Sequence, residues 1–258
     1  MSIGVGQAIL LGIIQGLTEF LPVSSSGHLV IVQMLLGLNA DMLMFDVFVH
    51  VGTLVAVFVA FWSDIKQLIL HPINRFLGLI LIACIPTGLI GVFLDDIFEN
   101  LFSSVVAVAI ALIVTGILLV LSDSFHGEKT IKEMKVTDAL LVGVLQGVAI
   151  TPGLSRSGTT IFGSLLLGLR REDAARFSFI VSIPVILGAA LKEGAEMVID
   201  HAFVMEWTYF LAAAVAAATG YLAIRLCLRL LKKQKMRYFS YYVWALALVV
   251  LVVRFFAA

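Results

Sequence analysis

Charged residues and cysteines are scarce in this chain. Only 13% of its 258 residues are charged and 61% are hydrophobic, whereas soluble domains carry roughly 25% charged residues. The formal net charge is zero, so nothing indicates nucleic-acid binding. The two cysteines, Cys84 and Cys227, lie in apolar segments and predict neither a disulfide framework nor a zinc site. The composition is that of an integral membrane protein.

Long polar stretches are also missing, and the apolar runs are long. A helix needs about 20 residues to cross a hydrocarbon core of about 30 Å. Runs of that order predict six transmembrane helices, at residues 43–62, 76–94, 101–121, 173–191, 207–231 and 240–256. Because lipid cannot satisfy exposed backbone groups, these segments must cross as helices. We therefore expect an all-α polytopic membrane protein with a single domain over residues 1–258.

Basic residues are unevenly distributed along the chain. None precedes Lys66, so the first apolar segment lacks the basic start of a signal peptide, and we expect the N-terminus to belong to the mature fold. The positive-inside rule predicts four cytoplasmic segments, at residues 66–75, 129–135, 170–176 and 232–237. The acid-rich segments 95–100 and 192–206 and the region of Asp41 are predicted to face outward.

Two segments do not fit six crossings. Residues 1–40 carry no basic residue and end at the outward Asp41, and residues 138–169 are apolar with cytoplasmic-type charge at both ends. Each must enter the bilayer and return to the same side, which predicts two re-entrant helical hairpins that enter from opposite faces. Irregular backbone at membrane depth is tolerated where it lines a cavity. The hairpin tips are therefore expected to line one.

The two hairpin segments resemble each other. An offset of 131 residues places 11–38 over 142–169 with ten identities in 28 positions, including an ordered QG, S-x-S-G and LLGL series. The same offset carries the three spans of the first half onto those of the second. We predict internal repeats of about 1–121 and 132–258. An odd number of crossings per half inverts the second copy, giving an inverted-topology repeat.

The hairpin tips hold most of the polar residues. The first tip, Thr18–His28, reads TEFLPVSSSGH, and the second, Thr151–Thr160, reads TPGLSRSGTT. A Pro or Pro-Gly breaks each entering helix. The following serines can cap the returning helix, whose N-terminus is suited to binding phosphate. Arg156 adds a fork of donors suited to bidentate phosphate recognition.

The first tip supplies complementary chemistry. Glu19 is singled out because an ionised side chain at mid-membrane costs about 2.5–3.5 kcal/mol even on lenient scales. Gln15 lies four residues earlier, on the same helical face. Ser25 is a candidate nucleophile, and His28 is a candidate general base or acid. For His28, a structural bond to a neighbouring serine is the alternative.

Other polar residues have a structural reading beside the functional one. Four serines at the tips can serve as helix caps alone or also as phosphate ligands: Ser24, Ser26, Ser155 and Ser157. Asp46 and His50 lie towards the outer end of a predicted span, where they face either a cavity or the membrane interface. We assign no function to Asp46 or His50.

Together the two motifs, QGLTEFLPVSSSGH and PGLSRSGTT, resemble the signatures of the bacterial undecaprenyl-diphosphate phosphatase family of the bacitracin-resistance type. The resemblance extends to length, hydropathy and repeat, so it covers essentially the whole chain. The first motif matches at Gln15, Glu19 and His28. The second matches at Pro152, Gly153, Ser155, Arg156, Ser157 and Thr160.

The resemblance implies an enzyme that hydrolyses undecaprenyl diphosphate to undecaprenyl phosphate, recycling the lipid carrier of cell-wall synthesis. It implies a multi-pass protein of the bacterial inner membrane whose site opens to the periplasmic side and depends on a divalent cation such as Mg²⁺ or Ca²⁺. The expected partners are the polyprenyl diphosphate and the bilayer, with no nucleic acid, and a homodimer is left open.

Roles for individual residues follow from the motif match. Glu19 and Gln15 are implied to bind the metal or position water, Arg156 to bind the diphosphate, and Ser25 and His28 to supply the nucleophile and proton transfer. The implied substrate-binding residues are Gln15, Ser24, Ser26, Gly153, Ser155, Ser157 and Thr160. Position 15 is Gln where some family members have Glu, but Mg²⁺ often needs only one or two carboxylates besides substrate oxygens.

A transporter or flippase of a phosphate-bearing lipid or anion is the alternative function. Inverted repeats with broken helices are typical of transporters, and Arg156 with two helix N-termini would hold an anion without cleaving it. A membrane scaffold gives no reason for paired polar tips. Glu19 repels anions unless a cation or proton intervenes, which favours chemistry. The residues leave open whether Ser25 or an activated water attacks.

Overall fold

The computed structural model describes residues 3–38, 42–199 and 205–257, and these are almost entirely helical. The α-helices are α1 (Val5–Phe20), α2 (Ser25–Leu35), α3 (Leu43–Ala60), α4 (Trp62–Leu70), α5 (Arg75–Phe93), α6 (Asp95–Phe102), α7 (Val105–Ser122), α8 (Val136–Val148), α9 (Arg156–Leu166), α10 (Arg171–Ile199), α11 (Trp207–Lys232) and α12 (Arg237–Ala257). A 3-10 turn, η1 (Ile131–Glu133), and one β-bridge between Lys129 and Leu169 complete the regular structure of the described ranges.

Within the described residues, six helices are long and apolar enough to cross a membrane: α3, α5, α7, α10, α11 and α12. They correspond one to one with the six predicted spans, so the predicted all-α class and the number of spans are confirmed. The main difference is α10, which continues to Ile199 instead of ending at residue 191. The segment predicted as an outward loop at 192–206 is therefore partly helix. Its residues 200–204, like Asp41, lie outside the described residues.

Two short helices lie largely between the predicted spans. Helix α4 follows α3 directly, and α6 follows α5. Each buries a single residue, Ile65 in α4 and Phe98 in α6. Such helices lie on the surface with one apolar residue turned inward, a pattern too short to stand out beside the long apolar runs.

Helices α1 and α2 form one helical hairpin, and α8 and α9 form another. Ser24 Oγ accepts a hydrogen bond from the Gly27 amide at 3.3 Å. Ser155 Oγ accepts the equivalent bond from the Gly158 amide at 3.1 Å. The predicted break in each hairpin and the predicted serine caps are therefore confirmed, because α2 and α9 each begin directly after the capping serine.

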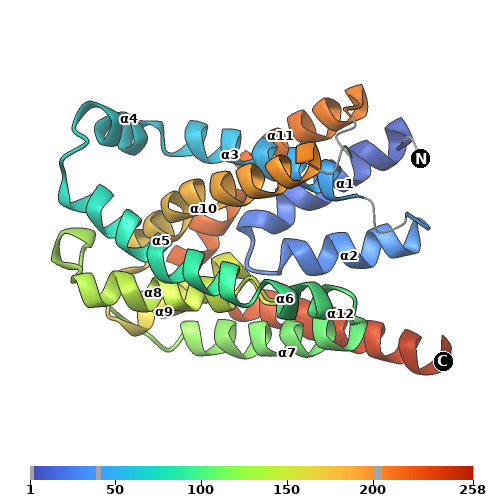
Figure 1. The fold of residues 1–258 in the computed structure, drawn as a ribbon. Coiled ribbons are helices and arrows are strands. Elements are labelled where there is room, and N and C mark those ends of the chain that lie inside the picture. The colour runs from blue at the N-terminus through green and yellow to red at the C-terminus, as the bar shows by residue number, and fades with distance from the viewer. Residues whose placement is uncertain (1–2, 39–41, 200–204, 258) are drawn as a thin grey trace.

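The two hairpins extend towards opposite ends of the molecule, and their tips meet. In Figure 1, α1 and α2 extend towards the end that holds the N-terminus, whereas α8 and α9 extend towards the other end. A methyl group at Gly27 would lie 3.2 Å from Cα of Gly153, and one at Gly158 would lie 3.2 Å from Cβ of Pro22. The 131-residue offset exchanges these two contacts, so the tips touch through equivalent positions.

Each hairpin packs against a helix from the other half of the chain. Helix α1 lies along α11, and α8 lies along α5. The remaining major contacts join α3 to α10 and α11, and α7 to α12. Phe20, which ends α1, is fully buried and meets Phe179 of α10 edge to face, with ring centroids 5.6 Å apart. The two halves are therefore interleaved, and the hairpin tips are enclosed by the longer helices.

The end predicted to be cytoplasmic is closed by polar contacts between loops. The Asp123 carboxylate accepts hydrogen bonds from the Met236 and Arg237 amides, both at 3.1 Å, and so caps α12. Arg171 donates to three carbonyls at the end of α7 and just beyond it. In η1, the backbone amide of Thr130 binds the Glu133 carboxylate and holds the pKa of that group below its usual range.

Candidate active site

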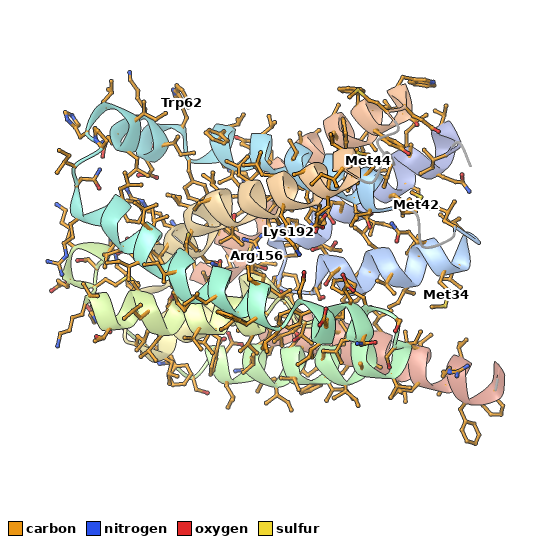
Figure 2. The ribbon with its side chains drawn as sticks, in the orientation of Figure 1. Met34, Met42, Met44, Trp62, Arg156 and Lys192 are labelled. Carbon is orange, nitrogen blue, oxygen red and sulfur yellow. The ribbon has the colours of Figure 1, made fainter. Side chains whose placement is uncertain are left out.

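Glu19, near the end of α1, is the centre of the polar contacts between the tips. It is only 5% exposed. Its Oε2 accepts hydrogen bonds from Ser25 Oγ at 2.6 Å and from Gln15 Nε2 at 2.9 Å. Arg156, on the opposite hairpin, donates from Nη2 to Oε1 of Glu19. Figure 2 places Arg156 near the middle of the molecule. These four residues, Gln15, Glu19, Ser25 and Arg156, are called the Glu19 cluster below.

Local structure explains why these side chains converge. Gln15 and Glu19 are four residues apart on α1 and therefore lie on one helical face. Ser25 and Arg156 are equivalent under the 131-residue offset, and each is the first residue of a returning helix. The first amides of a helix have no partner within it, and the helix dipole favours negative charge there. The Glu19 cluster is therefore flanked by two helix N-termini.

His50 of α3 also lies beside Glu19. Its Nε2 is 3.7 Å from Glu19 Oε2, and its side chain is 31% exposed. Its Nδ1 is bonded to the backbone carbonyl of Asp46 at 2.7 Å. The Asp46 carboxylate in turn accepts from Gln33 Nε2 of α2, also at 2.7 Å. Sequence reasoning assigned no function to either residue. The sequence pattern that could have indicated a function is an aspartate and a histidine four residues apart, on one face of a largely apolar span.

His28 does not join the Glu19 cluster. Its Nδ1 is bonded to the Ser24 carbonyl and its Nε2 to the Tyr242 hydroxyl, both at 2.7 Å. Because a carbonyl can only accept, Nδ1 carries the proton, and in the neutral ring Nε2 accepts from Tyr242. Both ring nitrogens are thus engaged, and neither is bonded to Ser25. Tyr242, on the apolar helix α12, gave no signal in the sequence.

The other serines at the tips are bonded within the tips. Ser26 Oγ lies 3.4 Å from Ser24 Oγ, and Ser157 Oγ lies 3.3 Å from Ser155 Oγ. Ser157 also donates to the Leu21 carbonyl of the other hairpin at 3.4 Å. Ser24 and Ser155 cap the helices, Ser26 and Ser157 bond to these capping serines, and Ser157 also joins the two tips. Structural roles therefore account for every contact of the four serines described here.

Gly153 and Thr160 shape the second tip. Gly153 has a φ of +91°, and its carbonyl accepts from Thr115 Oγ1 at 3.0 Å. A methyl group at Gly153 would lie 2.3 Å from the Val108 carbonyl oxygen, so only glycine fits. Thr160 Oγ1 donates to the Arg156 carbonyl at 2.8 Å and lies 2.5 Å from Ser178 Oγ of α10. Thr160 therefore anchors α9 and does not meet Glu19.

The residues at Glu19 are suited to a hard divalent cation. Among the described residues, no group of three or more His, Cys, Asp and Glu side chains is placed to hold a metal. However, Gln15 is fully buried, and its Oε1 has no hydrogen-bond partner. An amide oxygen beside a carboxylate provides two oxygen donors, and Mg²⁺ usually completes such a site with water and phosphate oxygens. The donor set fits the expected cation.

The fold and the Glu19 cluster define a multi-pass helical membrane protein whose buried polar site is built by two facing hairpin tips. A family profile described as "Bacitracin resistance protein BacA" matches residues 8–249. The chain belongs to this family, as the two motifs predicted.

Curated relatives match over nearly the whole chain. A protein named undecaprenyl-diphosphatase from Halothermothrix orenii is 48% identical over 250 residues, covering 95% of this chain and 96% of the relative. One of the same name from Carboxydothermus hydrogenoformans is 45% identical, covering 96% and 97%. A third from Methanosphaera stadtmanae is 40% identical, covering 95% and 96%. The matches leave no large unmatched segment in either partner.

Proposed function

We propose that the protein is an undecaprenyl-diphosphatase, which hydrolyses undecaprenyl diphosphate to undecaprenyl phosphate and inorganic phosphate. The name carried by relatives up to 48% identical over 95% of the chain supports this activity. The observation that carries the proposal is that the Ser25 hydroxyl and the Arg156 guanidinium both contact the same carboxylate, Glu19. A nucleophile, a proton acceptor and a phosphate-binding cation are therefore within one cluster.

Binding of the diphosphate starts from the ion pair between Arg156 and Glu19. The terminal phosphate competes with Glu19 for the guanidinium, whose fork of donors fits two phosphate oxygens. The N-termini of α2 and α9 add backbone amides at Ser25 and Arg156. Once the phosphate holds Arg156, Oε1 of Glu19 is released from its partner.

Ser25 is the nucleophile in this mechanism, and Glu19 is its base. Ser25 Oγ already donates to Glu19 Oε2 at 2.6 Å, which turns the hydroxyl lone pairs away from the carboxylate. As Oγ bonds to the terminal phosphorus, its proton passes to Glu19, and the bond from phosphorus to the bridging oxygen breaks. Undecaprenyl phosphate leaves with that oxygen. Glu19 gives its proton to that departing oxygen, accepts a proton from the water that attacks the phosphoserine, and passes it to Ser25 Oγ as inorganic phosphate is released.

Electrostatic stabilisation accompanies this transfer. Arg156 and the helix N-termini face the negative charge that spreads over the phosphoryl oxygens, the dominant contribution in phosphoryl transfer. A divalent cation held by Glu19 and Gln15 would neutralise further phosphate charge. Glu19 has two carboxylate oxygens: Oε1, which Arg156 releases to the phosphate, can accept the proton, while Oε2 would remain as a ligand.

In the membrane, the two hairpins are re-entrant and the chain is an inverted-topology repeat in the bacterial inner membrane. The serine caps, the tip contacts and the exchange of α1–α11 for α8–α5 packing under the 131-residue offset support the repeat. The first hairpin enters from the periplasmic side, since the basic segments lie at the opposite end. The diphosphate reaches Glu19 from the outer leaflet, with its polyprenyl tail between helices.

The proposal is tested by phosphate release from a long-chain polyprenyl diphosphate by purified protein in detergent, with and without EDTA. We expect EDTA-sensitive release that falls at least about 100-fold in Glu19→Ala, Arg156→Ala and Ser25→Ala. His71→Ala, an exposed residue distant from the tips, is the control. No release from folded native protein would reject the diphosphatase and favour the transporter reading.

The covalent route has its own test. Rapid acid quenching of native protein with terminally ³²P-labelled substrate should leave label on Ser25, identified by peptide mapping and absent in Ser25→Ala. Turnover in the native protein without any label on Ser25, under conditions that retain a phosphoserine standard, would instead favour direct attack by water, with Glu19 as its base.

A further inference from the structure

His50 has an arrangement that the phosphatase mechanism above does not use. Its Nδ1 is bonded to the Asp46 backbone carbonyl at 2.7 Å, so Nδ1 carries a proton and Nε2 of the neutral ring has a lone pair. That Nε2 lies 3.7 Å from Glu19 Oε2, which is beyond hydrogen-bond distance. Two electron-rich atoms at this spacing repel each other unless a proton or a cation lies between them.

The spacing is close to that of two ligands on one metal ion. Ligand distances of about 2.0–2.2 Å place neighbouring donors about 3.0–3.5 Å apart in octahedral or tetrahedral sites. Adjacent octahedral ligands lie at the lower end of that range, so Glu19 Oε2 and His50 Nε2 would move about 0.7 Å closer to bind one such ion. His50 is 31% exposed at its side chain, so a hydrated ion can reach it.

A third donor lies on the same face of α1. Gln15 donates from Nε2 to Glu19 Oε2 at 2.9 Å, while its own Oε1 is buried without a partner. A buried acceptor without a hydrogen bond calls for an explanation; Oε1 of the equivalent Gln146 lacks one as well, but Gln15 is the one bonded to Glu19. Coordination of a cation would satisfy Oε1 of Gln15. Helices α1 and α3 would then provide one nitrogen and two oxygen donors.

The support behind His50 matches what metal-binding histidines require. Such a histidine commonly donates its other ring N–H to a carbonyl or carboxylate, which fixes the tautomer and the ring orientation. Asp46 supplies that carbonyl. Its carboxylate is also held, by Gln33 of α2 at 2.7 Å. The ring is therefore oriented by contacts that extend from α3 into the first hairpin.

We propose that His50 is a ligand of the divalent cation, binding through Nε2 together with Glu19 and Gln15. This inference rests on the proposed function, because the cation belongs to that reaction. An imidazole among oxygen donors favours Mn²⁺ or a later transition metal over Ca²⁺, which takes oxygen ligands. The site is therefore selective for small ions that tolerate nitrogen.

Pulsed electron paramagnetic resonance of Mn²⁺ bound to the purified protein tests this directly. We expect ¹⁴N modulation from a coordinated imidazole, with and without inorganic phosphate, and a change of that modulation when histidine is labelled with ¹⁵N. His50→Gln should remove the nitrogen signal and weaken Mn²⁺ binding about tenfold or more, whereas His71→Gln should retain both. The labelled native protein shows, independently of any variant, whether a histidine coordinates the ion, and the variants assign which one.

The outcomes separate this proposal from the proposed function, because phosphate release is measured on the same samples. Mn²⁺ that binds in a Glu19-dependent way without nitrogen modulation would overturn the role of His50 and leave the phosphatase intact. EDTA-insensitive release with no Mn²⁺ bound would also overturn it. Loss of the nitrogen signal in His28→Gln, with the signal retained in His50→Gln, would identify His28 as the ligand and reject the proposal. No release at all from folded protein would reject the proposed function itself.

Discussion

At the scale of single residues, one buried carboxylate, Glu19, binds three different kinds of side chain. It accepts from a hydroxyl and an amide and pairs with a guanidinium, while its side chain is only 4% exposed. A buried charge is tolerated when it is paired and hydrogen-bonded. Arg156 therefore contributes to folding as well as to the proposed chemistry, and the two contributions can be measured separately.

The ion pair predicts non-additive stability. Arg156→Gln leaves Glu19 as an uncompensated buried charge, and Glu19→Gln does the same to Arg156. Each single substitution should lower the free energy of unfolding by about 3 kcal/mol, the cost of breaking a buried ion pair. The double variant removes both charges and should cost less than the sum by at least about 1 kcal/mol. Unfolding of the four proteins in one detergent measures this coupling. Additive losses would contradict a direct interaction between the two side chains.

His28 and Tyr242 predict a different profile. Tyr242→Phe removes the donor to Nε2 of His28 and should lower the free energy of unfolding by about 1 kcal/mol. Phosphate release should fall less than about tenfold, because the pair holds the tip without touching Ser25. Tyr238→Phe, an exposed position on the same helix, is the control. A 100-fold loss in Tyr242→Phe at unchanged stability would show that His28 acts in proton transfer.

At the scale of elements, the tips owe their shape to backbone features. Gly153 combines a positive φ with a close approach to α7, and Gly27 lies against it. The helix breaks were readable from Pro22 and Pro152, and the caps from the S-x-S-G pattern. The packing of α3 against α1 was not readable, because contacts between helices depend on tertiary geometry. His50 consequently stayed without a role until the structure placed it beside Glu19.

Substituting two glycines in turn distinguishes the cost of backbone strain from the cost of a steric clash. Gly153 and Gly168 have φ values of +91° and +85°, but a methyl group clashes only at Gly153, 2.3 Å from the Val108 oxygen. Gly168→Ala should cost about 1 kcal/mol, and Gly153→Ala at least about 2 kcal/mol more. Gly153→Ala should also reduce phosphate release more than tenfold, since Arg156 follows closely. Equal effects at both positions would contradict the proposed contact with α7.

At the scale of the whole molecule, polar contacts are concentrated at the end predicted to be cytoplasmic. Lys129 pairs with Asp138, and Arg237 pairs with Asp123 at 3.0 Å. The long apolar runs predicted the six spans, and the basic loops between them predicted an orientation. The helical continuation to Ile199 was not predicted, because its acidic residues resemble those of a loop.

The orientation is tested by thiol accessibility. Cys84 and Cys227 are the only cysteines, so both are first replaced by alanine, and single cysteines are introduced as Asp96→Cys and Lys132→Cys at exposed positions. In intact cells an impermeant reagent should label position 96, and position 132 only after permeabilisation. The reverse labelling pattern would place Glu19 on a path from the cytoplasm.

The contact between Arg156 and Glu19 also affects which anions the protein retains. Any phosphate that binds Arg156 must displace the Glu19 carboxylate, which is part of the same chain and cannot diffuse away. A free anion that is attracted only by its charge therefore competes poorly with the Glu19 carboxylate. The tail of a polyprenyl diphosphate anchors it in the bilayer. The diphosphate therefore stays near the site long enough to replace Glu19 on Arg156. Released inorganic phosphate has no such anchor, so the enzyme should resist inhibition by its own soluble product.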